Sequence, residues 1–369
     1  MFWYIVICIL MIYPLGIIWA GKVSGKKTER VALFSACLIL WFFMAMRGVY
    51  VGVDTKYYSY VFSQFDDIPL SEIFTAATYA TESETWTFDF EPGYRLLNKL
   101  VSFVSVSPQA ITIVNSTLII VLLYKLICKN SPDVMLSVWL FITLGIFQTE
   151  MNVTRNAIAI LLVYNALPYI HEKKFWKYVF ICLAASSFHI SAIAFIPLYW
   201  LLRNTSLTIK KCVLLIVGFS LTGIFFSITG PFIRMIMPSA FDRYFVVSNE
   251  KMVSLMIGIL NAGVFCICYM LLNRGERKRV FAEYSIGVCM LLMNVCFFGL
   301  NIGLGQASRM AALFGPYLII FIPQVLSLIE SDIRKKDATV LVVVLCGMQY
   351  IARLCINNIG GTMPYYFFW

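Results

Sequence analysis

Seven ionisable side chains lie at or near the ends of long apolar segments, where charged residues are rare. They are Arg47, Asp54, Glu91, Arg95, Arg155, His189 and Arg309. Charged groups near or inside membrane spans are costly in free energy and tend to mark functional sites. Arginine binds phosphate oxygens well, because its planar guanidinium presents paired donors. If these residues share one face of the membrane, they predict a site for an anionic, phosphate-bearing ligand.

Each of three arginines also has an ordinary explanation. Arg47 and Arg155 lie at the outer ends of apolar segments, and Arg309 begins another. An arginine in such a place commonly extends its guanidinium to lipid headgroups. Gly303 and Gly305, just before Arg309, would let a ligand approach the backbone closely. The prediction of a site therefore depends on the convergence of several groups.

Three proton-accepting side chains have similar alternatives. Asp54 can pair with Lys56 in a solvated loop. Glu91 precedes Pro92, which can begin a helix whose positive N-terminal end attracts a carboxylate. His189 lies in a polar stretch at 186–191, where a histidine can simply satisfy buried carbonyl groups. None of the three decides the function by itself.

The composition requires lipid as the main solvent of the chain. Of 369 residues, 60% are hydrophobic and 13% are charged, and the mean hydropathy is +0.83. Apolar runs of about 17 to 25 residues, each able to cross a hydrocarbon core of roughly 30 Å, recur from Phe2–Ala20 onward. We predict an all-α polytopic membrane protein with about ten to twelve transmembrane helices. It should form a single domain over residues 1–369, with no metal and no cofactor.

The basic residues predict how the chain crosses the membrane. Most of them lie in short loops, as the positive-inside rule expects of the cytoplasmic side. These loops are at 22–30, 125–129, 173–177, 203–211, 274–279 and 334–336. This distribution explains the net charge of +10 without nucleic acid. It places residues 48–109 in a large extracytoplasmic region, in which Tyr94–Ser105 has the pattern of a helix lying in the interface.

The segment Tyr178–Leu202 conflicts with this topology if it crosses the membrane once, because two basic loops would then face outward. The conflict disappears if the segment is a re-entrant hairpin broken at 186–191. Irregular backbone at membrane depth is tolerated only beside protein or a water-filled cavity. The turn of the hairpin would carry His189.

Four stretches of this sequence together resemble the EpsG family of bacterial membrane proteins. They are Arg47 with Gly52, Asp54 and Tyr58; Glu91-Pro92-Gly93-Tyr94; Met151–Ala159; and Phe188–Ser191. The family resembles Wzy-type polymerases of O-antigen, capsule or exopolysaccharide. The resemblance implies a GT-C-like membrane glycosyltransferase that joins undecaprenyl-diphosphate-linked repeat units. One departure is Asn156, where the family pattern has glutamine after the arginine.

The resemblance also implies roles for individual residues. Arg47, Arg155 and Arg309 would bind the diphosphate leaving group, because arginine can stabilise its charge without depending on a metal. His189, Glu91 and Asp54 are candidates for the base that accepts the proton of the sugar hydroxyl, with His189 favoured and Glu91 second. Further substrate contacts fall to Tyr58, Tyr94 and Asn152, and Tyr57 has the same stacking chemistry.

The resemblance places the protein in the bacterial cytoplasmic membrane, with its site facing the periplasm or exterior. Its partners would be lipid-linked donor and acceptor glycans, membrane lipids, and a chain-length regulator and flippase of the same pathway. One rival is a flippase or transporter of lipid-linked glycan, since transporters also use broken helices. A flippase should line its path with charges at several depths, and the inward spans here carry almost none. Another outer-face transferase, such as a glycan ligase, is the second rival.

Overall fold

The structure is a computed structural model that describes residues 25–74, 78–80, 85–87, 90–204, 207–236, 250–356 and 358–369. The chain forms two compact units. Unit 1 contains residues 1–130, 134–199 and 345–369, and unit 2 contains residues 131–133 and 200–344. The prediction of a single domain is not tested by this division, and we describe each unit by itself.

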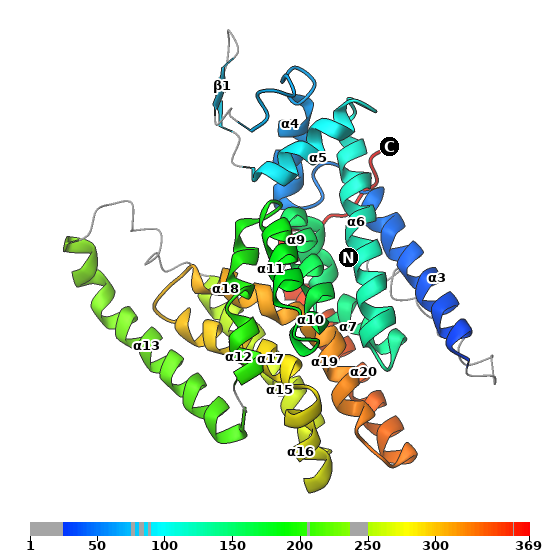
Figure 1. Cartoon of the computed structure of the whole chain (residues 1–369), viewed down its shortest axis with the longest axis vertical. Coiled ribbons are helices and arrows are strands. Elements are labelled where there is room, and N and C mark those ends of the chain that lie inside the picture. Colours follow the sequence, from blue (N-terminus) through cyan, green and yellow to red (C-terminus); the bar gives the residue numbers. More distant parts are fainter. Residues whose placement is uncertain are drawn as a thin grey trace. The chain divides into compact units, whose positions relative to one another are not determined.

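Unit 1 is built mainly from helices, with one short two-stranded sheet (Figure 1). Its elements are α3 (Lys26–Ala45), α4 (Val53–Ser63), β1 (Thr78–Ala80), β2 (Thr85–Thr87), α5 (Pro92–Ser102), α6 (Pro108–Asn130), α7 (Val134–Thr143), α8 (Ile146–Asn152), α9 (Thr154–Ala166), α10 (Pro168–His171), α11 (Phe175–Ser186), η1 (Ile190–Phe195), the start of α12 (Leu198–Asn204) and η4 (Ile359–Gly361). The strands β1 and β2 pair antiparallel. The long helices α3, α6 and α9 pack side by side, and α4 and α5 lie against α6.

Unit 2 is also helical. Its elements are the rest of α12, α13 (Ile209–Ile236), α15 (Glu250–Met270), α16 (Arg274–Glu283), α17 (Ser285–Leu300), α18 (Ala307–Phe314), η3 (Gly315–Tyr317), α19 (Leu318–Ser327) and most of α20 (Asp332–Ile356). Helix α17 packs against α13, α15, α18 and α19. Between α15 and α17, Asn261 Nδ2 donates to Asn294 Oδ1 over 3.0 Å, and Asn294 Nδ2 donates to the Ala311 carbonyl. Such hydrogen bonds hold apolar helices together in a membrane.

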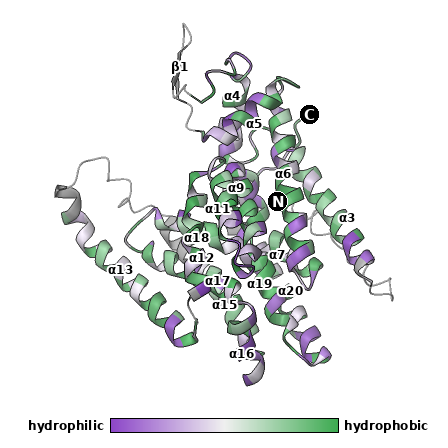
Figure 2. Cartoon of the chain, in the orientation of Figure 1, coloured by the Kyte–Doolittle hydropathy of each residue, from purple (hydrophilic) through white to green (hydrophobic). Residues whose placement is uncertain are grey.

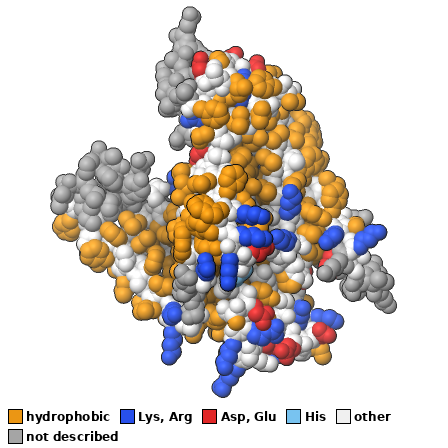
Figure 3. All heavy atoms as spheres, viewed as in Figure 1, with side chains coloured by type: hydrophobic (Ala, Val, Ile, Leu, Met, Phe, Trp, Pro, Cys, Tyr) orange, Lys and Arg blue, Asp and Glu red, His pale blue; other side chains and the backbone are white. Residues whose placement is uncertain are grey.

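The described helices confirm an all-α polytopic membrane protein. Five of them are long and apolar enough to span a membrane, and the number rises to seven if each of two bent pairs is one span. Three shorter apolar helices add to these, and the expected span Phe2–Ala20 lies outside the described residues. The hydropathy colours of Figure 2 show runs of apolar residues along α3, α6 and α13. On α13, Leu214, Ile228 and Phe232 are exposed, and Figure 3 shows hydrophobic side chains there, as expected of a lipid-facing surface.

A glycine divides the apolar run at 134–149. Gly145 has φ +73°, a left-handed conformation that most side chains resist, and it separates α7 from α8 at an angle of 64°. Arg353, near the end of α20, donates a hydrogen bond of 2.8 Å to the Leu144 carbonyl at this bend. A carbonyl released by the broken helix is thereby satisfied.

The predicted hairpin is present in the fold. Helix α11 ends at Ser186, η1 begins at Ile190, and η1 packs back against α11. The two arms are joined by Tyr178, whose hydroxyl donates to the Phe195 carbonyl over 2.7 Å. The break therefore lies within 186–191, where the topology argument required it.

Helix α5 buries both polar and apolar side chains. Lys99 is buried, and its ammonium donates to the Phe65 and Asp66 carbonyls at 3.0 and 3.3 Å. Tyr94 and Val101 are buried as well, whereas Leu100 is 52% exposed and Val104, just after the helix, is 87% exposed. The placement of this helix in the membrane interface stays a prediction.

Candidate functional site

Arg155 is the centre of a polar cluster in unit 1. It lies in the first turn of α9, directly after Val153, the residue that separates α8 from α9. Its Nη1 atom is 2.6 Å from Glu91 Oε2, and the two side chains are 16% and 17% exposed. A partly desolvated pair of this kind is stronger than one on an open surface, because water screens it less. The pair joins residues 64 positions apart in the sequence.

Aromatic rings surround the guanidinium of Arg155. Its central carbon lies 4.5 Å from the ring centre of Phe90, 5.6 Å from that of Tyr58 and 5.9 Å from that of Tyr94. The negative faces of such rings attract a cation and hold it in place. All three rings are buried. The cage leaves the guanidinium little freedom to move, so it is preorganised.

The two tyrosines of this cage remain neutral. Burial raises the pKa of the Tyr58 hydroxyl far above its usual range, and the charge of Arg155 opposes this only in part. Burial also raises the pKa of Tyr94, whose hydroxyl accepts a hydrogen bond of 2.8 Å from Asn115. Tyr94 has no exposed surface. Its placement supports Arg155 from within the protein, and stacking of Tyr94 on a sugar would need a different conformation.

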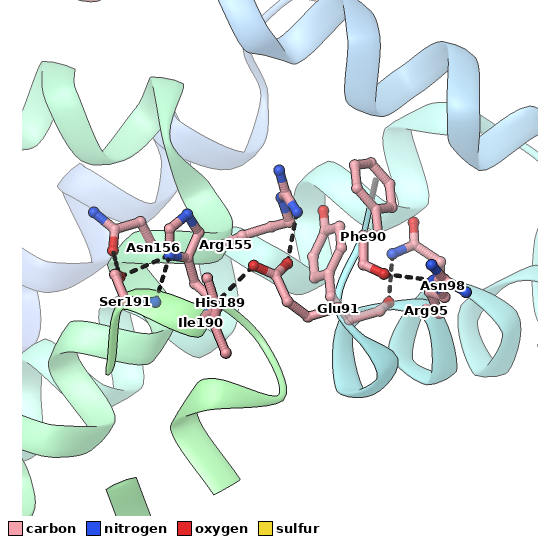
Figure 4. Close-up of polar contacts among 10 residues, drawn as sticks. Phe90, Glu91, Arg95, Asn98, Arg155, Asn156, His189, Ile190 and Ser191 are labelled. Carbon is pink, nitrogen blue, oxygen red and sulfur yellow. Dashed lines mark hydrogen bonds and ion pairs between the residues drawn. The ribbon is translucent and has the colours of Figure 1, made fainter. Parts of the chain in front are cut away.

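Glu91 connects Arg155 to the hairpin. While Oε2 pairs with Arg155, Oε1 accepts a hydrogen bond of 3.0 Å from the backbone N–H of Ile190 (Figure 4). The carboxylate thus joins the segment before α5, the start of α9 and the turn that begins η1. With both oxygens engaged, Glu91 is placed to position its neighbours more than to take a proton.

Gly93 allows the start of α5 to rest directly on the hairpin turn. The backbone N–H groups of Gly93 and Tyr94 donate to the Ser187 carbonyl at 2.8 and 3.1 Å. A Cβ atom at Gly93 would overlap the side chain and carbonyl of Ser187. The Glu-Pro-Gly-Tyr motif therefore combines a carboxylate, a helix start and a residue small enough for this contact.

We expect Gly93→Ala to lower the stability of the protein strongly, because it must push α5 and Glu91 away from the hairpin turn. The matched control is Gly218→Ala on α13, where an added Cβ meets nothing within 4 Å. The two variants should be compared by thermal unfolding in detergent. Equal unfolding temperatures would show that the close contact at Gly93 does not hold α5 on the hairpin turn.

His189 is oriented by a short chain of polar side chains. Its Nδ1 atom lies 2.7 Å from Ser191 Oγ, and that hydroxyl donates to Asn156 Oδ1 over 3.1 Å (Figure 4). Hydrogen bonding at Nδ1 fixes the plane of the ring and directs Nε2 away from Ser191. Asn156, the departure from the family pattern, therefore has a definite partner. The sequence analysis did not predict this role of Asn156 and Ser191, although both residues lie in stretches that resemble the EpsG family.

Asp54 begins α4 and is held by Asn152. The backbone N–H of Asp54 donates to Asn152 Oδ1 over 2.8 Å, so this amide caps the N-terminal end of α4. Gly52, with φ +99°, lies against both Thr55 and Asn152. Asn152 was expected to contact substrate. Its amide oxygen connects α8 to the start of α4, and its contact with substrate stays a prediction.

Arg47 lies away from the surface of the site. It is 2% exposed, and its guanidinium donates to the Met44 carbonyl, to the Met151 carbonyl at 2.9 Å and to Ser116 Oγ at 3.4 Å. These bonds join the end of α3 to α6 and α8. The expected contact with diphosphate is not the role that this placement supports. Arg47 instead holds the end of α8 in position through Met151, the neighbour of Asn152.

A segment near the end of the sequence supports the loop between α3 and α4. Gly48 N–H donates to the Tyr366 carbonyl at 2.9 Å, Gly52 N–H to the Gly361 carbonyl at 3.1 Å, and Phe368 N–H to the Met46 carbonyl at 3.1 Å. This red segment passes the end of α3 in Figure 1. Hydropathy and motifs carried no signal of the pairing, since backbone hydrogen bonds do not depend on side-chain type.

Arg309 belongs to unit 2, whereas the other predicted site residues belong to unit 1. It lies in the first turn of α18 and is exposed. The backbone N–H of Ser308, beside it, donates to Asn301 Oδ1 over 3.3 Å.

Arg95, also part of the predicted cluster, belongs to unit 1. It donates from Nε to the Phe90 carbonyl and so helps to hold the aromatic cage in place.

The described part of unit 1 therefore brings together Arg155, Glu91, His189, Asp54 and Tyr58. This arrangement offers a caged cation for an anionic group and two kinds of proton acceptor close by. A group of three or more His, Cys, Asp or Glu side chains that could hold a metal is not found among the described residues.

Comparison with known proteins gave one match. A family model described as the EpsG family matches residues 30–367. No curated protein and no solved structure matches the chain.

Proposed function

Since this chain belongs to the EpsG family, whose members are Wzy-like polysaccharide polymerase-type membrane proteins, we propose that it joins undecaprenyl-diphosphate-linked repeat units into a surface polysaccharide. The observation that supports this most is the caged Arg155, which is tied through Glu91 to a turn that carries His189. A fixed, partly exposed guanidinium is suited to a diphosphate. His189 is only partly buried, so a hydroxyl of the acceptor sugar can reach its ring.

The proposed reaction transfers the donor glycan from its lipid diphosphate to a hydroxyl of the acceptor sugar. The bond between the anomeric carbon and the diphosphate oxygen of the donor breaks, and the electron pair leaves with the lipid diphosphate. A hydroxyl oxygen of the acceptor sugar bonds to the anomeric carbon, and its proton passes to a base. Arg155 stabilises the charge that develops on the diphosphate, and a preorganised donor is effective because it need not reorient during the reaction.

We assign the base to His189. Its ring is held at Nδ1 by Ser191, and a neutral imidazole can take a proton near neutral pH. Glu91 is engaged by Arg155 and Ile190, and Asp54 lies at the start of α4. The diphosphate contact of Arg309, which belongs to unit 2, rests on the sequence alone.

A glycan ladder tests the proposed function. The protein is expressed in a polymerase-deficient host together with the matching repeat-unit pathway. We expect the wild type to produce a ladder, and cells without the protein to accumulate single repeats on the lipid carrier outside the cytoplasmic membrane. Accumulation of single repeats on the cytoplasmic side would instead identify a flippase. Single repeats transferred to the final acceptor only in the presence of the protein would identify a ligase.

The proposed orientation has its own test. After the native cysteines are replaced, Asp67→Cys should react with a membrane-impermeant thiol reagent added to intact cells, because this charged position after α4 is exposed and belongs to the expected extracytoplasmic region. Ile333→Cys, at a 75% exposed position next to the basic stretch of α20, is the control and should react only after permeabilisation. The reverse pattern would place the site on the cytoplasmic side.

A further inference from the structure

We propose that Asp54 and Tyr57, both on α4, form the subsite for the sugar bonded to the donor diphosphate. This inference rests on the proposed function and adds a sugar site next to the diphosphate site. Its first support is the exposure of Tyr57. The three rings around Arg155, those of Tyr58, Phe90 and Tyr94, are buried, whereas Tyr57, which packs on Tyr58 and Phe90, is 42% exposed.

The ring of Tyr57 is held in place. It meets the Phe90 ring edge to face, with centres 5.6 Å apart and planes at 84°, and its centre is 6.3 Å from that of Tyr58. Such packing restricts the side chain, so little conformational entropy is lost when a ligand stacks on it. Tyr57 is thus a rigid aromatic surface beside a buried aromatic cluster.

The position of Tyr57 matches the chemistry of the donor. The Phe90 ring contacts both the Tyr57 ring, with centres 5.6 Å apart, and the Arg155 guanidinium, at 4.5 Å. Tyr57 is therefore separated from the proposed diphosphate site by one ring. The C–H groups on the face of a pyranose are attracted to the negative face of an aromatic ring. The first sugar of the donor is the part of the substrate that reaches this place.

Asp54 supplies the polar half of the subsite. Residues three positions apart on a helix lie on one side of it, with Cβ atoms about 5–6 Å apart, so Asp54 neighbours Tyr57. Its backbone is anchored by Asn152, and its charge acts on Tyr58. A carboxylate beside a ring can accept hydrogen bonds from sugar hydroxyls while the ring covers the apolar face. This arrangement makes Asp54 a sugar-binding residue and leaves the proton transfer to His189.

Binding of two lipids tests this subsite. Full-length protein in nanodiscs is titrated with undecaprenyl diphosphate and with the lipid-linked repeat unit extracted from a polymerase-deficient host. We expect Tyr57→Ala to weaken binding of the repeat unit about tenfold and leave binding of undecaprenyl diphosphate unchanged. Tyr57→Phe, which keeps the ring, should bind both lipids like the wild type. Asp54→Asn should also weaken only the glycosylated lipid.

Two controls separate this inference from the proposed function. Arg155→Ala should weaken both lipids, because it removes the diphosphate contact. Trp176→Ala removes an aromatic side chain that is 78% exposed on α11 and should change neither. If Tyr57→Ala binds both lipids like the wild type, or loses both equally, Tyr57 is only a packing or membrane-interface residue and the subsite is wrong. If the wild type binds neither lipid, the proposed function fails and the subsite with it.

Discussion

Arg155→Ala should lower the rate of polymer formation by at least about a thousandfold, as expected when a preorganised group that stabilises transition-state charge is removed. The guanidinium is held by Glu91 at 2.6 Å and by three aromatic rings, so no neighbouring cation can take its place readily. Arg155→Lys should retain only a small part of the activity. A lysine ammonium keeps the charge but lacks the planar pair of donors that fits a phosphate.

The measurement is the initial rate of polymer formation by purified protein in nanodiscs, with lipid-linked repeat units as substrate. Arg203→Ala, at an exposed position on α12, is the matched control and should be as active as the wild type. The unfolding temperature of the Arg155 variants should fall by a few degrees, because the pair with Glu91 and the contacts with three rings are lost, so rates are compared for equal amounts of folded protein. If Arg155→Ala formed polymer at more than about a tenth of the wild-type rate, Arg155 would not be the group that stabilises the transition state.

Replacing Arg47 by methionine should have the opposite signature, a large loss of stability. The side chain is 2% exposed and holds the ends of α3 and α8 together through the Met44 and Met151 carbonyls. Removing a buried charged group that satisfies several acceptors costs roughly 3 kcal/mol, because those acceptors lose their partner. Polymer yield should fall in proportion to the loss of folded protein.

Thermal unfolding of purified protein in detergent checks this expectation, with Arg30→Ala on the exposed side of α3 as control. Arg47→Met should unfold several degrees below both the wild type and the control. An Arg47→Met protein as stable as the wild type but unable to make polymer would restore the direct contact with diphosphate that the sequence predicted.

The break in the hairpin shows how far sequence reasoning reached into the fold. The distribution of basic residues required a turn within 186–191, and α11 ends at Ser186. That inference succeeded because membrane crossing imposes parity on successive loops, so a local charge pattern constrains a long stretch of chain. The bend at Gly145 was missed, because a glycine within an apolar run does not by itself reveal whether its φ is positive.

The candidate site was predicted in its residue types and only partly in its roles. Arg155, Glu91 and His189 are gathered in unit 1, as the convergence argument expected. Asn152 and Arg47 were expected at the substrate, and the structure shows them holding α4 and α8. A residue type states what a side chain can bind, whereas its burial decides whether a substrate can reach it.

By itself, the sequence determined the class of the protein, the helical nature of its spans and the set of rare charges available for chemistry. Each of these follows from composition or from local periodicity, which the surrounding fold does not alter. The tertiary structure alone decided that Glu91 meets both Arg155 and Ile190, which lie 64 and 99 residues away. It also decided that Arg47 is enclosed and Tyr57 exposed. Such pairings depend on the packing of distant helices, because a charge can be satisfied by any complementary group that the fold brings within reach.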